Sequence, residues 1–396
     1  MKNFFYPLVK DPYRNKDIQA AIKVVKSHKL NAGNQTIKFQ NIFKKKIKVN
    51  NAIMVNSGSS ANLLALQCII NPYRRKRLKS GDEVLIPSLC WSTSLWPIIQ
   101  SGLKPKFIDI DKSTLNLNLN DLESKISKKT KAILIVHVLG NTTNMDRLMK
   151  IKKKYNLILI EDTCESLGTK YGNKYLGTFG EISTFSFYAS HQISSGEGGM
   201  VCCNSTEDAE IIKALRAHGW SRGLKNENKI ANQNKHLDRK FIFYNSGFNL
   251  RSTDIAASIG ISQFKDLDKF IKTRNINRLK ILKEVSKSKK INEKIHIIKE
   301  NKKVKASWFG MPITLSKSIN KRLFIKKIEK MGIETRPIIS GNFLKQPALK
   351  KYKLISKIKM KNADFINNQG FFIGLPTKII SNNIVKRLVK VFEQSV

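Results

Sequence analysis

Short apolar segments alternate with amphipathic helical patterns between Ala52 and Asn204, and this alternation restricts the fold more than any other feature. Runs rich in β-branched residues, such as AILIVHV at 132–138, are typical of strands that helices cover on both faces of a mostly parallel sheet. We therefore predict an α/β fold whose ligand lies at the carboxyl ends of the strands. The predicted strands are EVLIP (83–87), KPKFIDI (104–110), KAILIVHV (131–138), LILIED (157–162), STFSFY (183–188) and GMVCCN (199–204).

The regions on either side of this alternating core have different patterns. Residues 16–49 are predicted to form amphipathic helices, an arm that packs on another subunit. The later strands, SWFGMPITL (307–315), IETRPIIS (333–340) and GFFIGLP (370–376), lie among helices and indicate a smaller α+β domain. We therefore predict a large domain at 1–267, which includes the arm, and a small domain at 268–396. The lysine-rich stretch 271–305 is predicted to be a solvated helix followed by a loop.

The chain is strongly basic, with 73 lysine and arginine residues against 29 aspartate and glutamate residues and a net charge of +44. Such a charge attracts phosphate groups. The basic residues are nevertheless spread along the whole chain, and no zinc finger, recognition helix or aromatic RNA-binding motif accompanies them. We therefore expect no nucleic-acid partner, and we interpret the basic field as favourable for an anionic small substrate.

The sequence carries no targeting signal that we recognise. No apolar run approaches the roughly 20 residues that span a bilayer, and the first residues contain no apolar segment of signal-peptide length. The five cysteines form no CxxC pair, so we expect neither a disulfide framework nor a metal site. Adjacent Cys202 and Cys203 are predicted to face opposite sides of one strand. These patterns predict a cytoplasmic protein with no membrane contact.

Three segments place polar or aromatic side chains at predicted strand ends or helix starts. NSGSSANLLALQ (56–67) puts small residues before an apolar helix, where free main-chain amides and serine hydroxyls bind phosphate. LILIEDTCES ends a strand at Asp162, whose buried carboxylate needs a partner, and a protonated ring nitrogen would be a suitable one. LCWSTS places Trp91 where an indole face covers a flat heterocycle. Helix capping, a capped turn and a core tryptophan remain alternative explanations.

A fourth segment, TFSFYASHQISSGEGGMV, runs from a strand end at Ser186 through His191 to a glycine-rich turn. A phosphate cradle, a strand-end aspartate, an aromatic cover and this segment together predict a site for a pyridoxal-type cofactor. Over nearly its whole length the chain resembles the fold-type I pyridoxal-phosphate family of nucleotide-sugar aminotransferases and dehydratases, the DegT/DnrJ/EryC1/StrS type. The matching segments, in order, are NSGSSAN, PSLCWSTS, VHVLGNTTNMD, IEDTCESLGTKYGNKYLGTFG, TFSFYASHQISSGEGGMV, LRAHGWSRG and GFNLRSTDIAASIGISQ.

The identity of residue 191 indicates which branch of the family the chain resembles. In the aminotransferase members a lysine at this position binds the cofactor covalently, and the imidazole of His191 has no primary amine for that bond. The sugar 3-dehydratases of the family carry histidine there, and SFYASHQIS, RAHGWSR, SWFGMPI and TRPIISGNFLK are especially similar to them. A second histidine branch holds an iron–sulfur cluster through cysteines after the GEGG turn. Residues 216–241 contain no cysteine, so we expect no cluster.

The resemblance implies a role for each residue that matches a family motif. Gly58, Ser59 and Ser186 would hold the cofactor phosphate. Asp162 would pair with the pyridine nitrogen and keep the ring an electron sink. Trp91 would stack on the ring.

Further roles implied by the resemblance concern the ring substituents, the partner subunit and the substrate. Glu165 would lie near the ring substituents. Asn249 would reach the phosphate from a neighbouring subunit, which would make a homodimer with shared sites necessary. His218, Trp220 and Arg251 are candidates for substrate binding, with a purely structural role as the alternative for His218. No metal ion is implied.

The implied reaction removes the C3 hydroxyl of a nucleotide-linked 4-keto-6-deoxyhexose with pyridoxamine phosphate, and L-glutamate would then re-aminate the resulting pyridoxal phosphate. His191, with an ordinary pKa near about 6.5, would be the base and a candidate acid for the departing oxygen. Two alternatives remain open: an aminotransferase relative that acts on another ketosugar, and a catalytically silent sugar- or cofactor-binding protein. The presence of Asp162, Ser186 and Trp91 beside His191 argues against the silent protein, because a decaying site would lose several parts.

Overall fold

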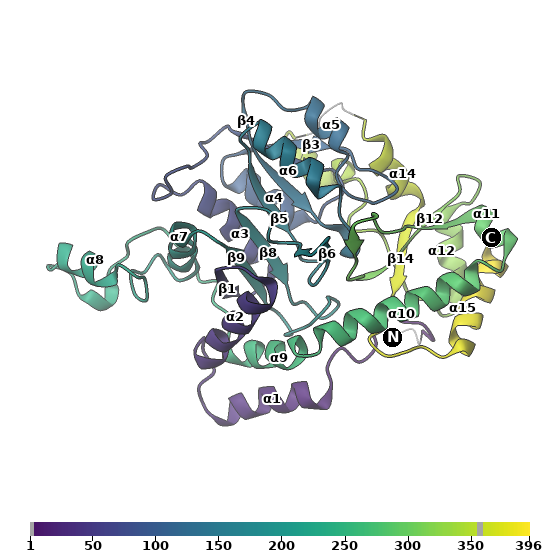
Figure 1. Ribbon diagram of the computed structural model, residues 1–396, viewed down its shortest axis with the longest axis horizontal. Coiled ribbons are helices and arrows are strands. Elements are labelled where there is room, and N and C mark those ends of the chain that lie inside the picture. The colour runs from purple at the N-terminus through teal and green to yellow at the C-terminus, as the bar shows by residue number, and fades with distance from the viewer. Residues whose placement is uncertain (1–3, 355–358) are drawn as a thin grey trace.

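A seven-stranded sheet forms the centre of the computed structural model, which describes residues 4–354 and 359–396 (Figure 1). The strand order is β1-β9-β8-β5-β4-β2-β3, in which β8, β5, β4, β2 and β3 are parallel and β9 is antiparallel to both β8 and β1. The strands are β1 (Asn51–Val55), β2 (Glu83–Pro87), β3 (Lys104–Ile108), β4 (Thr130–Val136), β5 (Ile158–Asp162), β8 (Ile182–Ser186) and β9 (Gly199–Cys203). The predicted α/β sheet and its six strands are confirmed, and β1 is an additional strand.

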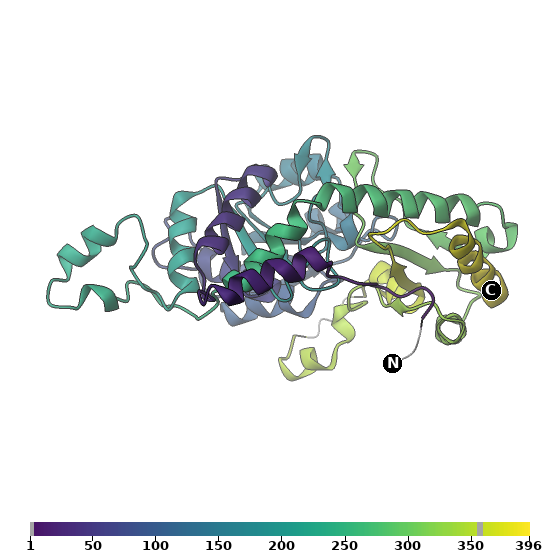
Figure 2. The same ribbon diagram turned by 90° about the horizontal axis from the view of Figure 1, so that it is seen from below.

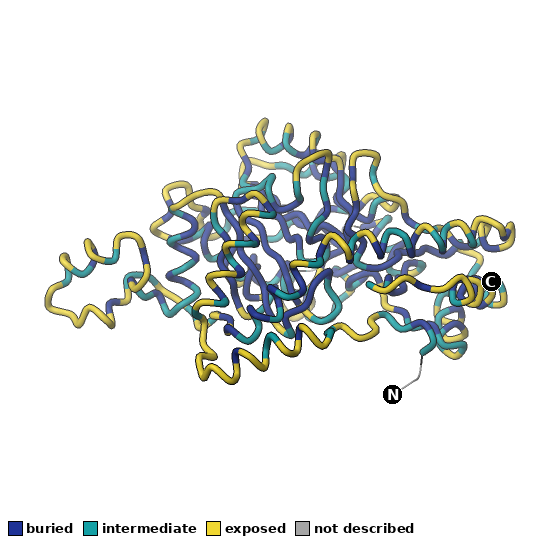
Figure 3. The backbone as a smooth tube through the Cα atoms, turned by 60° about the horizontal axis from the view of Figure 1, so that its bottom comes forward, coloured by how far each residue is buried: buried dark blue, intermediate teal, exposed yellow. Residues whose placement is uncertain are grey.

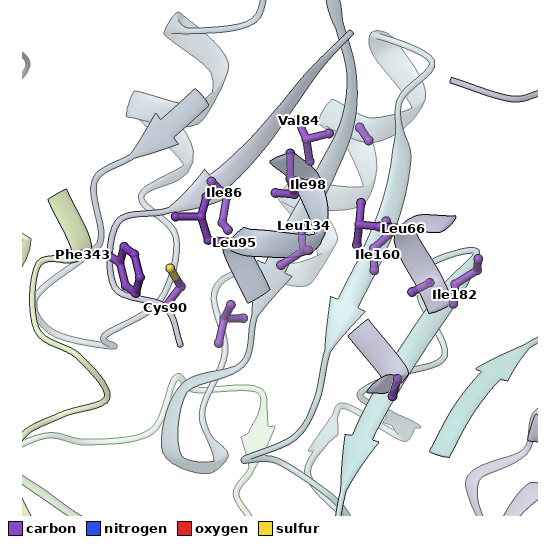
Figure 4. Packing of buried hydrophobic residues seen from close by; sticks show 14 of the residues in the cluster. Leu66, Val84, Ile86, Cys90, Leu95, Ile98, Leu134, Ile160, Ile182 and Phe343 are labelled. Carbon is purple, nitrogen blue, oxygen red and sulfur yellow. The ribbon is translucent and has the colours of Figure 1, made fainter. Parts of the chain in front are cut away.

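Helices cover both faces of this sheet, as its continuous apolar strands require. The helices of this part of the chain are α1 (Asn15–Lys26), α2 (Asn34–Ile47), α3 (Gly58–Ile69), α4 (Ser92–Gln100), α5 (Leu119–Ser124), α6 (Met145–Lys154), α7 (Thr206–Arg216), α8 (Glu227–Gln233) and α9 (Asp254–Phe264), with short 3-10 turns at Val138–Gly140 and Arg239–Phe241. On one face α3, α4 and α7 pack on the strands, and Figure 4 shows Leu66 and Ile98 beside Ile86, Leu134 and Ile160. On the other face α2, α9, α5 and α6 contribute the buried residues.

The two adjacent cysteines of β9 lie on opposite faces of the main sheet. Cys203 belongs to the apolar cluster under α3 and α7, whereas Cys202 belongs to the cluster under α2 and α9. The prediction that they face opposite sides of one strand is confirmed, because successive side chains of a strand alternate between its faces. Both thiols are buried and unpaired.

The rest of the chain forms a second layer beside the main sheet. A four-stranded sheet has the order β10-β12-β14-β13, and a small three-stranded sheet has the order β11-β6-β7. The elements are α10 (Leu267–Val285), α11 (Lys289–Lys294), β10 (Ile295–Ile297), β11 (Val304–Lys305), β12 (Gly310–Leu315), α12 (Lys321–Lys330), β13 (Thr335–Arg336), a 3-10 turn (Phe343–Lys345), α13 (Pro347–Lys351), α14 (Lys361–Gln369), β14 (Gly370–Gly374) and α15 (Asn382–Ser395), with β6 (Lys170–Tyr171) and β7 (Lys174–Tyr175) from the preceding part. The predicted strand at 333–340 is only two residues long, because Pro337 has no N–H to extend the ladder. The predicted boundary between residues 267 and 268 falls at the start of α10 and stays a prediction.

At 271–305 the predicted helix is confirmed, but the predictions that it is solvated and that a loop follows it are wrong. Helix α10 buries Phe270, Arg274, Asn277 and Ile281, a stripe at helical spacing, while its lysines occupy the remaining surface. The segment after it continues into α11 and β10, and β10 pairs with β12. The sequence pattern did not reveal this buried stripe, because two of its residues, Arg274 and Asn277, are polar and would be expected at the surface.

Two segments extend from the body of the molecule. Helix α1 runs along the outside beside α9, and the chain before it crosses to the second sheet, where Tyr6 pairs with Ile333 (Figure 2). The segment that carries α8 protrudes at the far end and is mostly exposed, in contrast to the buried strands of the main sheet (Figure 3). Within residues 4–354 and 359–396, every helix is too short or too polar to cross a lipid bilayer.

A buried carboxylate joins β5 to the loop that precedes β8. Glu161 is fully buried and accepts hydrogen bonds from the main-chain N–H groups of Gly177 (2.8 Å), Phe179 (2.7 Å) and Gly180 (2.7 Å) and one from His137 Nε2 (3.1 Å). Burial by itself would raise the pKa of Glu161, but His137 and the amides outweigh it and lower this pKa below the ordinary value of 4.5. The charged carboxylate therefore stabilises the fold above about pH 4.5, and this contribution is lost as the pH falls below that value.

We expect Glu161→Gln to lower the free energy of unfolding by about 3 kcal/mol at pH 7, because the side-chain amide of glutamine cannot accept hydrogen bonds from all of these donors. Urea unfolding at a fixed protein concentration measures the change. Asp268→Asn is the control, since Asp268 is exposed and forms an ion pair with Lys46 (2.6 Å) on the surface. Equal unfolding midpoints for the two variants would contradict this role of Glu161.

Candidate active site

A cavity of about 530 Å³ lies at the carboxyl edge of the main sheet. Val136 ends β4, Asp162 ends β5 and Ser186 ends β8, and all three line the cavity. Phe309 and Phe372 close it from the side of the four-stranded sheet. The site residues expected from the sequence that line it are Gly58, Ser59, Trp91, Asp162, Glu165, Ser186 and His191. The fold thus brings seven of the eleven predicted residues together within one chain.

The other four predicted residues form a separate cluster that does not line this cavity. Arg251 donates hydrogen bonds to His218 Nε2 (3.3 Å) and to Asn249 Oδ1 (3.2 Å). The rings of His218 and Trp220 are 4.9 Å apart between centroids. Asn249 and Arg251 are exposed, so this cluster is available at the surface of a single chain.

The start of α3 and the end of β8 form a tight cradle. Ser57 caps the helix by accepting a hydrogen bond from the main-chain N–H of Ser60 (3.0 Å), and the first amides, at Gly58 and Ser59, have no acceptor within the helix. A β-carbon at Gly58 would lie 2.5 Å from Cβ and 3.0 Å from Oγ of Ser186. Glycine at position 58 is therefore required for the helix start to approach the strand end, and this approach produces an anion-binding cradle of amides and hydroxyls.

We expect Gly58→Ala to weaken cofactor binding roughly tenfold to a hundredfold, because overpacking of this kind costs about 1–3 kcal/mol and displaces the cradle. Titration of the apoprotein with pyridoxal phosphate, followed by absorbance, measures the Kd. Gly81→Ala is the control: Gly81 lies outside the cavity, and an added β-carbon there meets no atom within 4 Å, so this variant shows only the effect of backbone strain from the positive φ (+87°). The expectation fails if both variants bind the cofactor as tightly as the unaltered protein.

Asp162 is held in one orientation at the floor of the cavity. Its Oδ2 accepts hydrogen bonds from Asn62 Nδ2 (2.8 Å) and Ser94 Oγ (2.7 Å), and its Oδ1 accepts one from the main-chain N–H of Cys164 (3.2 Å). A carboxylate has about four acceptor positions, so one position remains for a donor in the cavity. We did not predict Asn62 or Ser94, although Asn62 lies one helical turn after Gly58 and so on the same face of α3.

Trp91 precedes α4 and remains 57% exposed beside the cavity, so its indole face is free to cover a flat ligand. Glu165 is held by the main-chain N–H of Leu139, which donates to its Oε2 (2.9 Å). Burial, aided by the charge of Asp162, raises the pKa of Glu165 to about 7 despite the opposing hydrogen bond from Leu139. This carboxyl group therefore exchanges a proton readily near neutral pH.

His191 follows β8 and presents one ring nitrogen to the cavity. Its Nδ1 donates a hydrogen bond to the main-chain oxygen of Cys164 (2.6 Å), because a carbonyl can only accept, and Nε2 of the neutral ring is therefore unprotonated. Burial lowers the pKa of His191 to about 4, although the hydrogen bond to Cys164 and the charge of Asp162 oppose the shift. Nε2 has no hydrogen-bond partner among the described residues and is available as a base at neutral pH.

Two residues that we did not predict complete the surroundings of the cavity. Gln192 is buried, and its Nε2 donates hydrogen bonds to the main-chain oxygens of Glu165 and of Ser307 (3.1 Å). Arg336 lines the cavity from the end of β13 and adds an exposed positive charge. Both positions lie in segments that resemble the family, but the type and spacing of the residues gave no reason to select them.

A mostly parallel sheet, a helix-start cradle at its carboxyl edge and a second sheet that closes the cavity define the fold-type I class of pyridoxal-phosphate enzymes. Residues 12–392 match the model of the DegT/DnrJ/EryC1/StrS aminotransferase family. The chain belongs to this family.

Known relatives and solved structures agree over the whole chain. It is 34% identical to GDP-4-keto-6-deoxy-D-mannose 3-dehydratase of Escherichia coli O55:H7, over 93% of this chain and 95% of the relative. The protein of the same name from Yersinia pseudotuberculosis is 36% identical over 93% of each chain. A solved structure of the E. coli 3-dehydratase with bound hydrated pyridoxal phosphate has a TM-score of 0.91 and 33% identity, covering 99% of this chain and 100% of the other.

Proposed function

We propose that the protein is a pyridoxamine-phosphate-dependent 3-dehydratase of a nucleotide-linked 4-keto-6-deoxyhexose, with GDP-4-keto-6-deoxymannose as the first choice of substrate. The observation that carries the proposal is His191, an imidazole with a free Nε2 at the position where aminotransferases of the family carry lysine. The 3-dehydratases of E. coli and Yersinia pseudotuberculosis support the choice of substrate.

The residues of the cavity fit this cofactor. The amides of Gly58 and Ser59 and the hydroxyl of Ser186 suit a phosphate, the free acceptor position of Asp162 suits a protonated ring nitrogen, and Trp91 covers the ring. When bound, pyridoxamine phosphate supplies an amine for the C4 ketone of the sugar and a ring that carries the electron pair expelling the C3 hydroxyl.

His191 moves the protons of this reaction. Nε2 accepts the proton from the C4′ carbon of the cofactor, and the resulting imidazolium, which its buried surroundings disfavour, donates a proton to the departing C3 oxygen. Asp162 would hold the ring nitrogen through its free acceptor position. Glu165, beside Asp162, completes the polar floor of the cavity.

The proposal includes L-glutamate as amino donor and a homodimer with shared sites. Asn249, His218, Trp220 and Arg251 lie outside the cavity of their own chain, and this position suits a cluster that completes the site of a partner subunit. We also propose a cytoplasmic location, because five unpaired cysteines are typical of a reducing compartment.

Product analysis by mass spectrometry tests the proposed reaction. The purified protein is incubated with pyridoxal phosphate, L-glutamate and GDP-4-keto-6-deoxymannose, beside a His191→Lys variant. We expect a glutamate-dependent product that lacks one oxygen atom, and we expect the variant not to form it because its amine captures the cofactor.

Two other results would replace the proposal. An amino sugar from the unaltered protein would make it an aminotransferase. The absence of turnover on this and other nucleotide-linked ketosugars would favour a catalytically silent sugar- or cofactor-binding protein.

A further inference from the structure

An arginine without a carboxylate partner is buried directly behind the proposed base. Arg274 of α10 is only 7% exposed. Its Nη2 donates a hydrogen bond to the main-chain oxygen of His191 (3.2 Å), and its Nε donates one to the main-chain oxygen of Leu375 (3.1 Å), just after β14. Its Nη1 is buried without a hydrogen-bond partner, and no carboxylate among the described residues lies within ion-pair distance of it.

A buried, uncompensated charge is costly for the fold, so its position needs a reason. Burial lowers the pKa of Arg274 to about 10, and the guanidinium therefore stays charged at neutral pH. The two main-chain oxygens that it binds belong to the loop of the base and to the segment that follows β14 of the four-stranded sheet. Arg274 thus connects these two parts of the molecule and places a positive charge next to the loop of His191.

We propose that Arg274 is a positioning residue for His191: it holds the main chain of the His191 loop against the segment after β14, and its charge adds to the burial that disfavours protonation of the imidazole. The hydrogen bond acts on the position of the ring, because it fixes the backbone from which the ring projects. The charge acts on its protonation, because a cation in a low-dielectric interior disfavours a second cation nearby.

Several groups act on the protonation of His191 in addition to Arg274. Burial lowers its pKa most strongly, the hydrogen bond to Cys164 and the charge of Asp162 raise it, and Arg274 lowers it. The other titratable groups that line the same cavity are Cys164, Glu165, Tyr188, Glu197 and Arg336. A smaller pocket that His191 shares with Arg274 is also lined by Lys10, Asp11 and Arg14. The charge of Arg274 lowers the pKa of His191 whereas the charge of Asp162 raises it, so removing Arg274 should leave the effect of Asp162 without this opposition.

Direct titration of the imidazole tests the proposal without substrate. The protein carries ¹³C-labelled histidine, and the His191 ring signal is identified by its absence in His191→Asn. Arg274→Gln removes the charge, and Arg274→Lys retains it. Arg278→Gln is the matched control: Arg278 is 4% exposed, lies one turn along α10, and donates to the main-chain oxygen of Ile298 (2.5 Å) without contacting His191.

We expect the titration midpoint of His191 to rise by about one pH unit in Arg274→Gln and to stay near that of the unaltered protein in Arg274→Lys and Arg278→Gln. An unchanged midpoint in Arg274→Gln, or an equal shift in Arg278→Gln, would overturn the electrostatic part of the proposal. Because this titration needs no turnover, its result does not depend on whether the protein is a dehydratase.

Kinetics test the positional part, which rests on the proposed function. We expect kcat for dehydration to fall about tenfold in both Arg274→Gln and Arg274→Lys, with KM for the nucleotide sugar unchanged, because either change loses at least one of the two hydrogen bonds. Arg278→Gln should keep kcat. If Arg274→Lys has the same kcat as the unaltered protein, or if kcat falls tenfold in Arg278→Gln, the positional role is contradicted.

Discussion

Replacement of His191 by asparagine is expected to lower kcat for dehydration about a thousandfold, the typical contribution of a general acid–base residue. The asparagine side-chain amide can still donate to the main-chain oxygen of Cys164, as Nδ1 of the histidine does (2.6 Å), so the loop keeps its main contact. It has no basic nitrogen in place of Nε2, however, and cannot take a proton from carbon. Steady-state rates of formation of the deoxygenated product measure the loss.

The control for this variant is His296→Asn, an exposed histidine on β10 that lies outside the cavity. It should keep full activity. Absorbance of the bound cofactor in His191→Asn should match that of the unaltered protein, which separates loss of the base from loss of the cofactor. A kcat within tenfold of the unaltered protein would assign the base to another residue, and Glu165 would then be examined first.

Replacement of Asp162 by asparagine is expected to lower kcat about a hundredfold to a thousandfold, as removal of a preorganised electrostatic group does in other enzymes. The neutral amide no longer stabilises a protonated ring nitrogen. Its NH₂ group also faces a donor in either orientation, Asn62 and Ser94 on one side or the main-chain N–H of Cys164 on the other, so at least one of these donors loses its acceptor. Product formation measures kcat, and the absorbance maximum of bound pyridoxal phosphate reports protonation of the ring.

Asp146→Asn is the matched control for this variant, because the carboxylate of Asp146 is 54% exposed and pairs with Lys303 (2.6 Å) away from the cavity. It should leave both readouts unchanged. If Asp162→Asn retains kcat and the absorbance maximum of the unaltered protein, Asp162 is a structural residue, and the capped-turn explanation holds.

The sequence was most informative where the evidence is local. Apolar, β-branched runs predicted six strands of the main sheet, because a strand that is buried on both faces needs an apolar residue at nearly every position. The alternation of side chains along a strand likewise predicted the opposite burial of Cys202 and Cys203. Small residues before α3 and the carboxylate at the end of β5 marked two parts of the cavity, since helix starts and strand ends have recognisable residue types.

The wrong prediction for helix α10 also has a physical reason. Helix α10 was predicted to be solvated because the stretch is rich in lysine, whereas its buried stripe includes Arg274 and Asn277, which donate hydrogen bonds to main-chain oxygens elsewhere in the fold. Helical periodicity does not identify such residues, because polar side chains are normally counted as exposed.

By itself, the sequence determined the type of fold, the edge of the sheet that carries the site and, through the family motifs, the importance of His191. Tertiary structure decided which atoms support those residues. Asp162 receives its donors Asn62 and Ser94 from 100 and 68 residues earlier in the chain, and His191 meets Arg274 across 83 residues. Contacts of this kind depend on the packing of whole elements, and neither residue type nor spacing along the chain records which side chains that packing brings together.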